Sequence, residues 1–161
     1  MLGVDSGLKT GLAYFTPDGR LAWYRSHNYG TPARLKRGVF GLLSQLPNLN
    51  IIVVEGGGTL SRIWEREAQR RQAEFQQIAA EHWRDLLLLP REQKSGPEAK
   101  RFAEQAARRV IAWSKLPKPT ALRHDAAEAI LIGLWGVLAY GRLQELPSEL
   151  HIRYTAPTSF L

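Results

Sequence analysis

The amino-acid sequence predicts an α/β fold in which three antiparallel strands precede parallel strands and helices flank the resulting mixed sheet. Two observations predict it. Short apolar segments separated by turn residues fill the start of the chain, and helical-period segments alternate with apolar runs after it. The chain has 161 residues, 44% of them apolar and 23% charged, so it can bury a core. Because single cores commonly hold roughly 100 to 200 residues, we expect one domain over residues 1–161.

Three strands are predicted at the start. Apolar residues at 2–4 and 12–15 lie on either side of the Ser6-Gly7 turn. A third apolar segment, residues 21–25, follows the turn at residues 17–19, Pro-Asp-Gly, which supplies the backbone angles of a tight reversal. Strands joined by such short connections are expected to run antiparallel.

A helix and a buried strand are predicted next. Apolar residues recur at helical spacing from Pro32 to Leu46, and Pro47 and Asn48 end this segment. Residues 51–54 form the β-branched run Ile-Ile-Val-Val without alternation, which is typical of a strand buried on both faces.

The second half of the chain is predicted to hold three helices and one more strand. We expect a long helix over residues 61–82 with Ser61 as its cap, and a buried strand at residues 86–89. Further helices are expected over residues 97–116 and 124–140. The last is apolar almost all round and should lie against the sheet, but its apolar stretch is shorter than the about 20 residues of a membrane span. The predicted order is β-β-β-α-β-α-β-α-α.

The charge of the chain indicates a polyanionic partner. There are 22 Lys and Arg against 15 Asp and Glu, which gives a net charge of +7 and a pI near 10.1. No run of five like charges occurs, so a basic surface must be assembled by folding.

The absence of cysteine excludes disulfides, and four scattered histidines argue against structural zinc. The chain starts without a signal-like segment, so we expect a cytoplasmic location and no membrane partner.

Four carboxylates stand where the pattern favours apolar or neutral residues. One ends the first strand, one ends the strand at residues 51–54, and two lie three apart at the start of the last helix. We call them the four acids: Asp5, Glu55, Asp125 and Glu128. Sites form at strand ends of α/β sheets, and residues three apart share a helix face. Clustered carboxylates demand a cation, and Mg²⁺ prefers their hard oxygens. Two such ions about 4 Å apart would hold a water nucleophile and a leaving oxygen on a phosphodiester.

Each acid also has a structural explanation. Asp5 with Ser6 and Gly7 is compatible with an Asx turn, and Glu55 with a solvated strand end. The pair at 125 and 128 is compatible with a capping box. Residues 3–10 nearly match a phosphate-binding loop, but Leu8 replaces a required glycine. The joint occurrence of the four acids favours the metal site.

The sequence resembles the RuvC family of Holliday junction resolvases, within the RNase H-like superfamily. The resemblance is carried by residues 2–11 (LGVDSGLKTG), 52–55 (IVVE), 115–117 (KLP) and 124–129 (HDAAEA). It implies an RNase H-like fold, ligation of Mg²⁺ or Mn²⁺, two ions per site, by the four acids, and a homodimer that nicks two strands of branched DNA such as a four-way junction. A branch-migration helicase is a further partner that it implies.

The sequence departs from the family at three positions. Ser6 stands where the family usually has Pro, Glu128 where it usually has Asp, and Gly58 where an aromatic residue often serves junction opening. Trp64, one turn into the next helix, is a candidate to stack on bases instead. A residue of the core or of a dimer interface is the alternative for Trp64.

Several cations are candidate phosphate contacts. Lys9 lies beside Asp5 in the first hairpin, and Lys94 lies before the helix at residues 97–116 in a segment similar to the family's basic loop. Weaker candidates on helix surfaces are Arg62, Arg66, Arg70 and Lys100. Such contacts set register and affinity rather than sequence choice. His124 either borders the metal site or is an exposed residue before the helix.

Two alternative functions remain open from the sequence. One is another RNase H-like nuclease that acts on RNA, an RNA–DNA hybrid or a flap. The other is a non-catalytic DNA-binding relative of the fold, against which the presence of all four acids argues.

Overall fold

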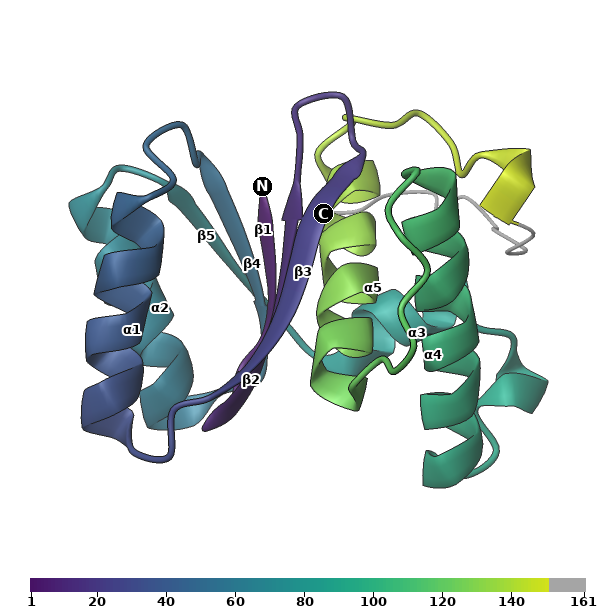
Figure 1. The fold of residues 1–161 in the computed structure, drawn as a ribbon, viewed down its shortest axis with the longest axis horizontal. Coiled ribbons are helices and arrows are strands. Elements are labelled where there is room, and N and C mark those ends of the chain that lie inside the picture. Colours follow the sequence, from purple (N-terminus) through teal and green to yellow (C-terminus); the bar gives the residue numbers. More distant parts are fainter. Residues whose placement is uncertain (151–161) are drawn as a thin grey trace.

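In the computed structural model, which describes residues 1–150, the chain forms a sheet with helices on both of its sides (Figure 1). The strands are β1 (Leu2–Asp5), β2 (Lys9–Phe15), β3 (Leu21–Asn28), β4 (Ile51–Glu55) and β5 (Glu74–Ile78). The helices are α1 (Pro32–Ser44), α2 (Gly58–Arg70), α3 (Ala80–Leu87), α4 (Gly96–Trp113) and α5 (His124–Ala139). Residues 151–161 lie outside the described part.

The sheet is mixed, with the strand order β3-β2-β1-β4-β5. β1 and β3 pair antiparallel with β2, whereas β4 runs parallel to both β1 and β5. The predicted fold class is therefore confirmed: three antiparallel strands precede parallel strands in an RNase H-like sheet flanked by helices.

The helices form two layers. α1 and α2 cover one face of the sheet, while α3, α4 and α5 lie on the other (Figure 1). α5 is buried along most of its length, as its composition predicts, and it packs on β1 and β2. Glycines allow this close approach. A Cβ at Gly3 would lie 2.6 Å from the carbonyl oxygen of Ala129, and one at Gly11 would collide with the backbone of Asp125. The start of α5 is thus pressed against the sheet beside the end of β1.

The prediction of one long helix over residues 61–82 is wrong. α2 ends at Arg70, β5 follows at Glu74–Ile78, and α3 then begins at Ala80. Ser61 does not cap a helix either, because Gly57 occupies the cap position and Ser61 is buried within α2.

α2 ends without the glycine that usually takes the left-handed position after a helix. Gln72 adopts a φ of 56°, and the N–H groups of Gln72 and Ala73 donate back to the carbonyls of Gln69 and Ala68. This is the Schellman arrangement, in which glycine usually occupies the left-handed position. A glutamine at this position explains why the sequence pattern gave no helix end here.

The predicted strand at residues 86–89 is also wrong. Leu86 and Leu87 form the last turn of α3, where they and Trp83 are buried at helical spacing. A short apolar run has no periodicity that separates a strand from a buried helix end. The observed order therefore gains α3, and the fifth strand comes earlier in the chain than predicted.

The remaining helices match the predictions except at their ends. α1 ends two residues before the predicted Leu46, α4 spans Gly96–Trp113, and α5 ends at Ala139. In α4 the end is again a left-handed residue other than glycine, Lys115, with a φ of 59°. Within residues 1–150, no helix combines the length and the apolar character needed to cross a bilayer.

Candidate active site

The first two acids lie side by side at the carboxyl ends of neighbouring parallel strands. Asp5 ends β1, Glu55 ends β4, and the two residues are directly paired in the register. Residues two apart on a strand share a face, so Asp5 lies on the same face as Gly3, against which α5 packs. Both acids are half-buried. The sheet therefore presents two carboxyl groups toward α5.

The other two acids come from the start of α5. Gly11 pairs with Asp5 across β1 and β2, and Gly11 is also the residue on which the backbone of Asp125 rests. Glu128 lies one turn further along the same helix face. Three elements far apart in the sequence thus bring the four acids to one place.

The electrostatics shows that the four acids act on one another. The pKa of Asp5 is raised to about 8, first by burial and then by the negative charges of Glu128, Glu55 and Asp125, and a hydrogen bond with Glu128 adds to the shift. Burial also raises the pKa of Glu55, against the effect of its hydrogen bond with Trp83. Without a cation, the cluster holds a proton on Asp5 near neutral pH.

Three of the four acids receive a hydrogen bond from a protein donor. Ser26 Oγ of β3 donates to Asp125 Oδ2 at 2.5 Å. Trp83 Nε1 of α3 donates to Glu55 Oε2 at 2.5 Å. The neighbouring Arg84 donates through Nη2 to Glu128 Oε1 at 3.3 Å and forms an ion pair with it.

The capping-box interpretation of the pair at 125 and 128 does not hold. Arg123 occupies the cap position of α5 and makes no side-chain cap bond. Asp125 bonds Ser26 and the next backbone N–H instead, and Glu128 pairs with Arg84. Both side chains are therefore directed into the cluster rather than back to the helix start.

The residues fit a hard divalent cation in type, although their side chains are not arranged around one. Among residues 1–150, no three His, Asp or Glu side chains already form a cation-binding group. Ser26, Trp83 and Arg84 each donate a hydrogen bond to one carboxylate oxygen, of Asp125, Glu55 and Glu128, respectively. Carboxylate oxygens are the ligands that Mg²⁺ prefers. In addition, the hydroxyl of Ser6, next to Asp5, is buried without a partner. A cation would relieve the charge repulsion that raises the pKa of Asp5.

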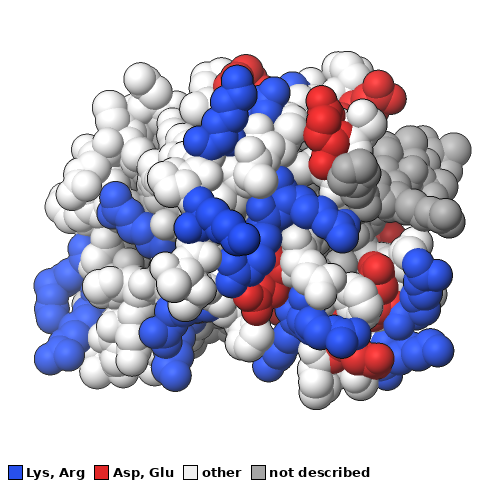
Figure 2. Space-filling view, turned by 45° about the vertical axis from the view of Figure 1, so that its right-hand side comes forward, with Lys and Arg blue, Asp and Glu red and all other residues white. Residues whose placement is uncertain are grey.

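The candidate phosphate contacts lie at the surface. Lys9 is exposed at the start of β2, Lys94 is exposed just before α4, and Arg62 and Lys100 are exposed on α2 and α4. Figure 2 shows Lys and Arg side chains spread over one face of the molecule, with smaller groups of acidic side chains among them. Their role in binding nucleic acid stays a prediction.

Two further candidates on α2 differ in their surroundings. Arg66 and Arg70 are both exposed, and Arg70 forms an ion pair with Glu67 at 2.7 Å. His124, at the start of α5, is exposed, in agreement with the structural alternative.

The prediction that Trp64 stacks on bases is wrong. Its side chain is fully buried, in the core between the sheet and the layer of α1 and α2. Helical spacing places Trp64 on the same inner face of α2 as Ala68. The core alternative is therefore correct, and Trp64 offers no ring to a nucleic acid.

Sequence reasoning missed the three residues that bond the acids. Trp83 and Arg84 were assigned no place near the sheet, because α3 was not recognised as an element of its own. Ser26 lies beyond the predicted end of the third strand at Arg25, whereas β3 extends to Asn28. Ser26 lies between two exposed residues, and this alternation was the signal that could have placed its side chain on the opposite face, toward the four acids.

Comparisons with known proteins place the fold. No protein-family model matches the sequence, and no curated protein matches it. Among solved structures, the chain is similar to T. thermophilus RuvC in complex with a Holliday junction substrate. The two share 14% sequence identity and a TM-score of 0.60, over 86% of this chain and 94% of that one. The chain therefore has a RuvC-like fold.

Proposed function

We propose that the protein is a divalent-metal-dependent endonuclease that hydrolyses phosphodiester bonds in branched DNA, most specifically by paired nicks in four-way junctions. The observation that carries the proposal is the convergence of the four acids from β1, β4 and α5 around Asp5, whose pKa is raised to about 8 by burial and then by the charges of the other three. The RuvC-like fold supports it, because the similar structure is a RuvC in complex with a Holliday junction substrate.

The four acids would hold the ions, and neighbouring side chains would orient them. Two Mg²⁺ or Mn²⁺ ions would activate a water molecule and stabilise the charge that develops on the leaving oxygen. Trp83 fixes the Glu55 carboxyl group from α3, and Ser26 fixes that of Asp125 from β3. Asp5, whose pKa is raised by the charges of all three other acids as well as by burial, would lose its proton once bound cations supplied the neutralising charge.

Basic side chains would hold the phosphate backbone around this cluster. We assign this role to four exposed residues: Lys9, Arg62, Lys94 and Lys100. Contacts of this kind make binding depend steeply on salt concentration. Cleavage, in contrast, would depend on the four acids.

Paired nicks require two active sites, so we propose that the protein acts as a homodimer. A branch-migration helicase would supply the junction. The family's junction-opening aromatic is replaced by Gly58, and Trp64 is buried, so the substrate itself must be tested.

Cleavage of synthetic substrates by the purified protein tests the proposal. In Mg²⁺ we expect nicks in a four-way junction, and loss of cleavage with retained binding in Asp5→Asn and Glu55→Gln. Glu145→Gln is a matched control, because Glu145 is an exposed acid on the chain segment after α5. Full activity of both active-site variants would reject the assignment. Preferential cleavage of a duplex, a flap or an RNA–DNA hybrid would support the nuclease activity but reject the four-way junction as its substrate.

A further inference from the structure

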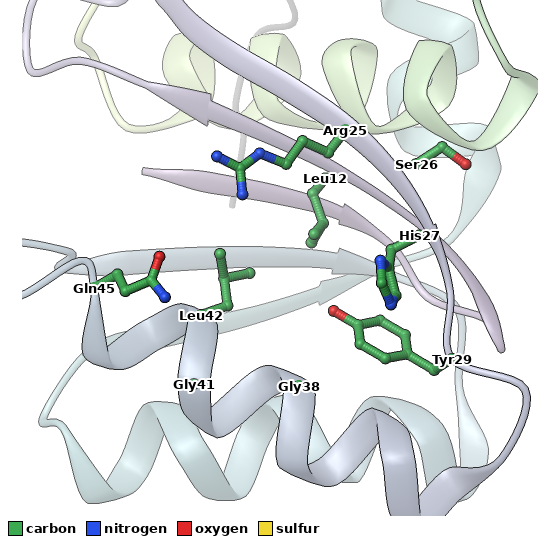
Figure 3. A pocket seen from close by; sticks show the side chains of 9 residues that line it. All are labelled: Leu12, Arg25, Ser26, His27, Tyr29, Gly38, Gly41, Leu42 and Gln45. Atoms are coloured by element: carbon green, nitrogen blue, oxygen red, sulfur yellow. The ribbon is translucent and has the colours of Figure 1, made fainter.

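A pocket of about 550 Å³ lies between β3 and α1, on the face of the sheet opposite the four acids (Figure 3). Two glycines of α1 make room for it. Gly38 lets the ring of Tyr29 lie against the helix, since a Cβ at Gly38 would collide with that ring. At Gly41 the space is open, because an added Cβ would meet no atom within 4 Å. The pocket thus exists because α1 has no side chain at Gly38 or Gly41.

The pocket combines rings, an apolar wall and hydrogen-bonding groups. The rings of His27 and Tyr29 lie with their centroids 4.3 Å apart, and Leu42 supplies an apolar surface. Arg25, Gln45 and the Tyr29 hydroxyl extend toward the space between β3 and α1 (Figure 3). Within residues 1–150, neither the Tyr29 hydroxyl nor the Gln45 amide is bonded to another side chain. These groups are free to bind a ligand.

The surface around the pocket is positively charged. Residues 19–54, which include β3 and α1, contain no Asp or Glu at all. Arg34 and Arg37 lie one turn before Gly38 and Gly41, respectively, so they continue the stripe of α1 that lines the pocket. Arg25, Arg34 and Arg37 form none of the ion pairs of the described chain. An anionic ligand would meet no carboxylate on either wall.

We propose that this pocket binds one nucleotide of a single-stranded nucleic acid. The base enters against Leu42 and the exposed ring of His27, which covers the buried ring of Tyr29, and stacking on a ring is favourable for any base. The Gln45 amide and the Tyr29 hydroxyl bond the base edge, and Arg25 binds the adjacent phosphate. Flanking phosphates contact Arg34 and Arg37. A duplex is disfavoured, because its bases are stacked and paired and do not enter a side pocket.

The pocket and the four acids share strand β3. Arg25, Ser26 and His27 all border the pocket, and because side chains alternate along the strand, the hydroxyl of Ser26 is directed to Asp125 and bonds it. β3 is an edge strand, and no described strand pairs with its outer side. An unpaired nucleic-acid strand that passes over this edge therefore reaches both sites. Binding at the pocket itself does not depend on the proposed cleavage.

Fluorescence anisotropy with a labelled oligothymidylate, at low salt and in EDTA, tests the proposal without cleavage. We expect Gly41→Leu, which fills the open space, and Arg25→Gln each to weaken binding by about tenfold, the scale of one stacked base or one lost charged contact. Lys118→Gln, a change of an exposed cation in the segment between α4 and α5, is the matched control and should change binding by less than about twofold. Circular dichroism establishes that each variant is folded.

A second measurement places the base. Photo-cross-linking of a 5-iodouridine oligonucleotide should label the peptide that contains Tyr29, and the label should disappear in Gly41→Leu. Wild-type affinity of both pocket variants would overturn the proposal, and so would an equal loss of affinity for duplex and single strand. Because this binding is measured in EDTA and requires no cleavage, a failure of the nuclease proposal leaves the result interpretable.

Discussion

The indole of Trp83 donates a hydrogen bond to the carboxyl group of Glu55 over 2.5 Å, from α3 to the end of β4. Trp83 is fully buried in the core on the α5 side of the sheet, so the donor is held by packing on all sides. A rigid indole is a precise support for one carboxyl group. It connects a helix that has no acid of the cluster to the chemistry of the site.

Replacement of this donor should lower the stability of the fold and also weaken the use of Mg²⁺ in cleavage. Trp83→Phe keeps a ring in the core but removes the N–H, and we expect a loss of about 1–3 kcal/mol in the free energy of unfolding. The less restrained Glu55 should raise the Mg²⁺ concentration needed for half-maximal cleavage. Titration of Mg²⁺ into the cleavage assay measures this shift. Trp23→Phe, on the opposite face of the sheet and stacked on Tyr14, is the control and should leave it unchanged.

Arg84 should oppose cation binding at Glu128. Its guanidinium pairs with that carboxylate at 3.3 Å, so an incoming ion must share or displace it. We expect Arg84→Met to melt at a lower temperature in EDTA and to gain more thermal stability on addition of Mn²⁺ than the wild type does, because a bound ligand stabilises the folded state. Isothermal titration of Mn²⁺ gives the affinity directly.

The matched control for this experiment is Arg108→Met. Arg108 pairs with Glu104 on α4 at 2.8 Å, in an ion pair that contains none of the four acids. Its Mn²⁺ response should equal that of the wild type. An unchanged or smaller Mn²⁺ response in Arg84→Met would show that Arg84 does not compete with the ion.

The raised pKa of Asp5 predicts a pH-dependent stability in the absence of divalent ions. The pKa is about 8 in the folded protein against 3.8 for an unperturbed aspartate, so between these values the folded state binds more protons than the unfolded state. Stability should therefore fall as pH rises from about 4 to about 8 and then level off. Asp5→Asn carries no such charge. It should match the wild type near pH 4 and exceed its stability above pH 8 by a few kcal/mol.

Denaturant unfolding of both proteins in EDTA across this pH range measures the difference. Saturating Mg²⁺ should remove it, because the ion neutralises the carboxylate of the wild type and finds a weaker site in the variant. A constant difference between the two proteins at all pH values would contradict the assignment of the shifted group to Asp5.

Glycine at position 11 should be required for the site to assemble. A Cβ there collides with the backbone of Asp125, so Gly11→Ala must displace α5 from β2. We expect a loss of about 2–4 kcal/mol in unfolding free energy, together with loss of cleavage. Gly96→Ala, where an added Cβ meets no atom within 4 Å, is the control and should be nearly neutral. Wild-type stability of Gly11→Ala would show that the helix can move away at little cost.

The sequence was most informative where periodicity and turn chemistry agree. The first three strands, β4 and α5 were all predicted because their apolar patterns and bounding residues are strong. The four acids were found for the same reason, since each interrupts such a pattern. Their mutual proximity followed from the fold class, and the raised pKa of Asp5 is consistent with it.

The region between α2 and α4 could not be predicted from local signals. Gln72 takes a left-handed conformation that usually calls for glycine, and β5 has the mostly polar sequence EFQQI. Its place at the sheet edge depends on parallel pairing with β4, a contact between distant residues. The hydrogen-bond donors of α3 were therefore not predicted either, because a hydrogen bond from Trp83 to Glu55 requires the tertiary arrangement.

The glycine contact between β2 and α5 also determines when the four acids come together. Asp5 is made early in synthesis and Asp125 late, and the two meet only after α5 has settled on Gly11. A nascent chain that contains only its first three strands still lacks three of the four acids, Glu55, Asp125 and Glu128. Under the proposed function, cleavage would therefore require α5 to be folded onto the sheet, and no partly synthesised form of the chain would have a complete metal site.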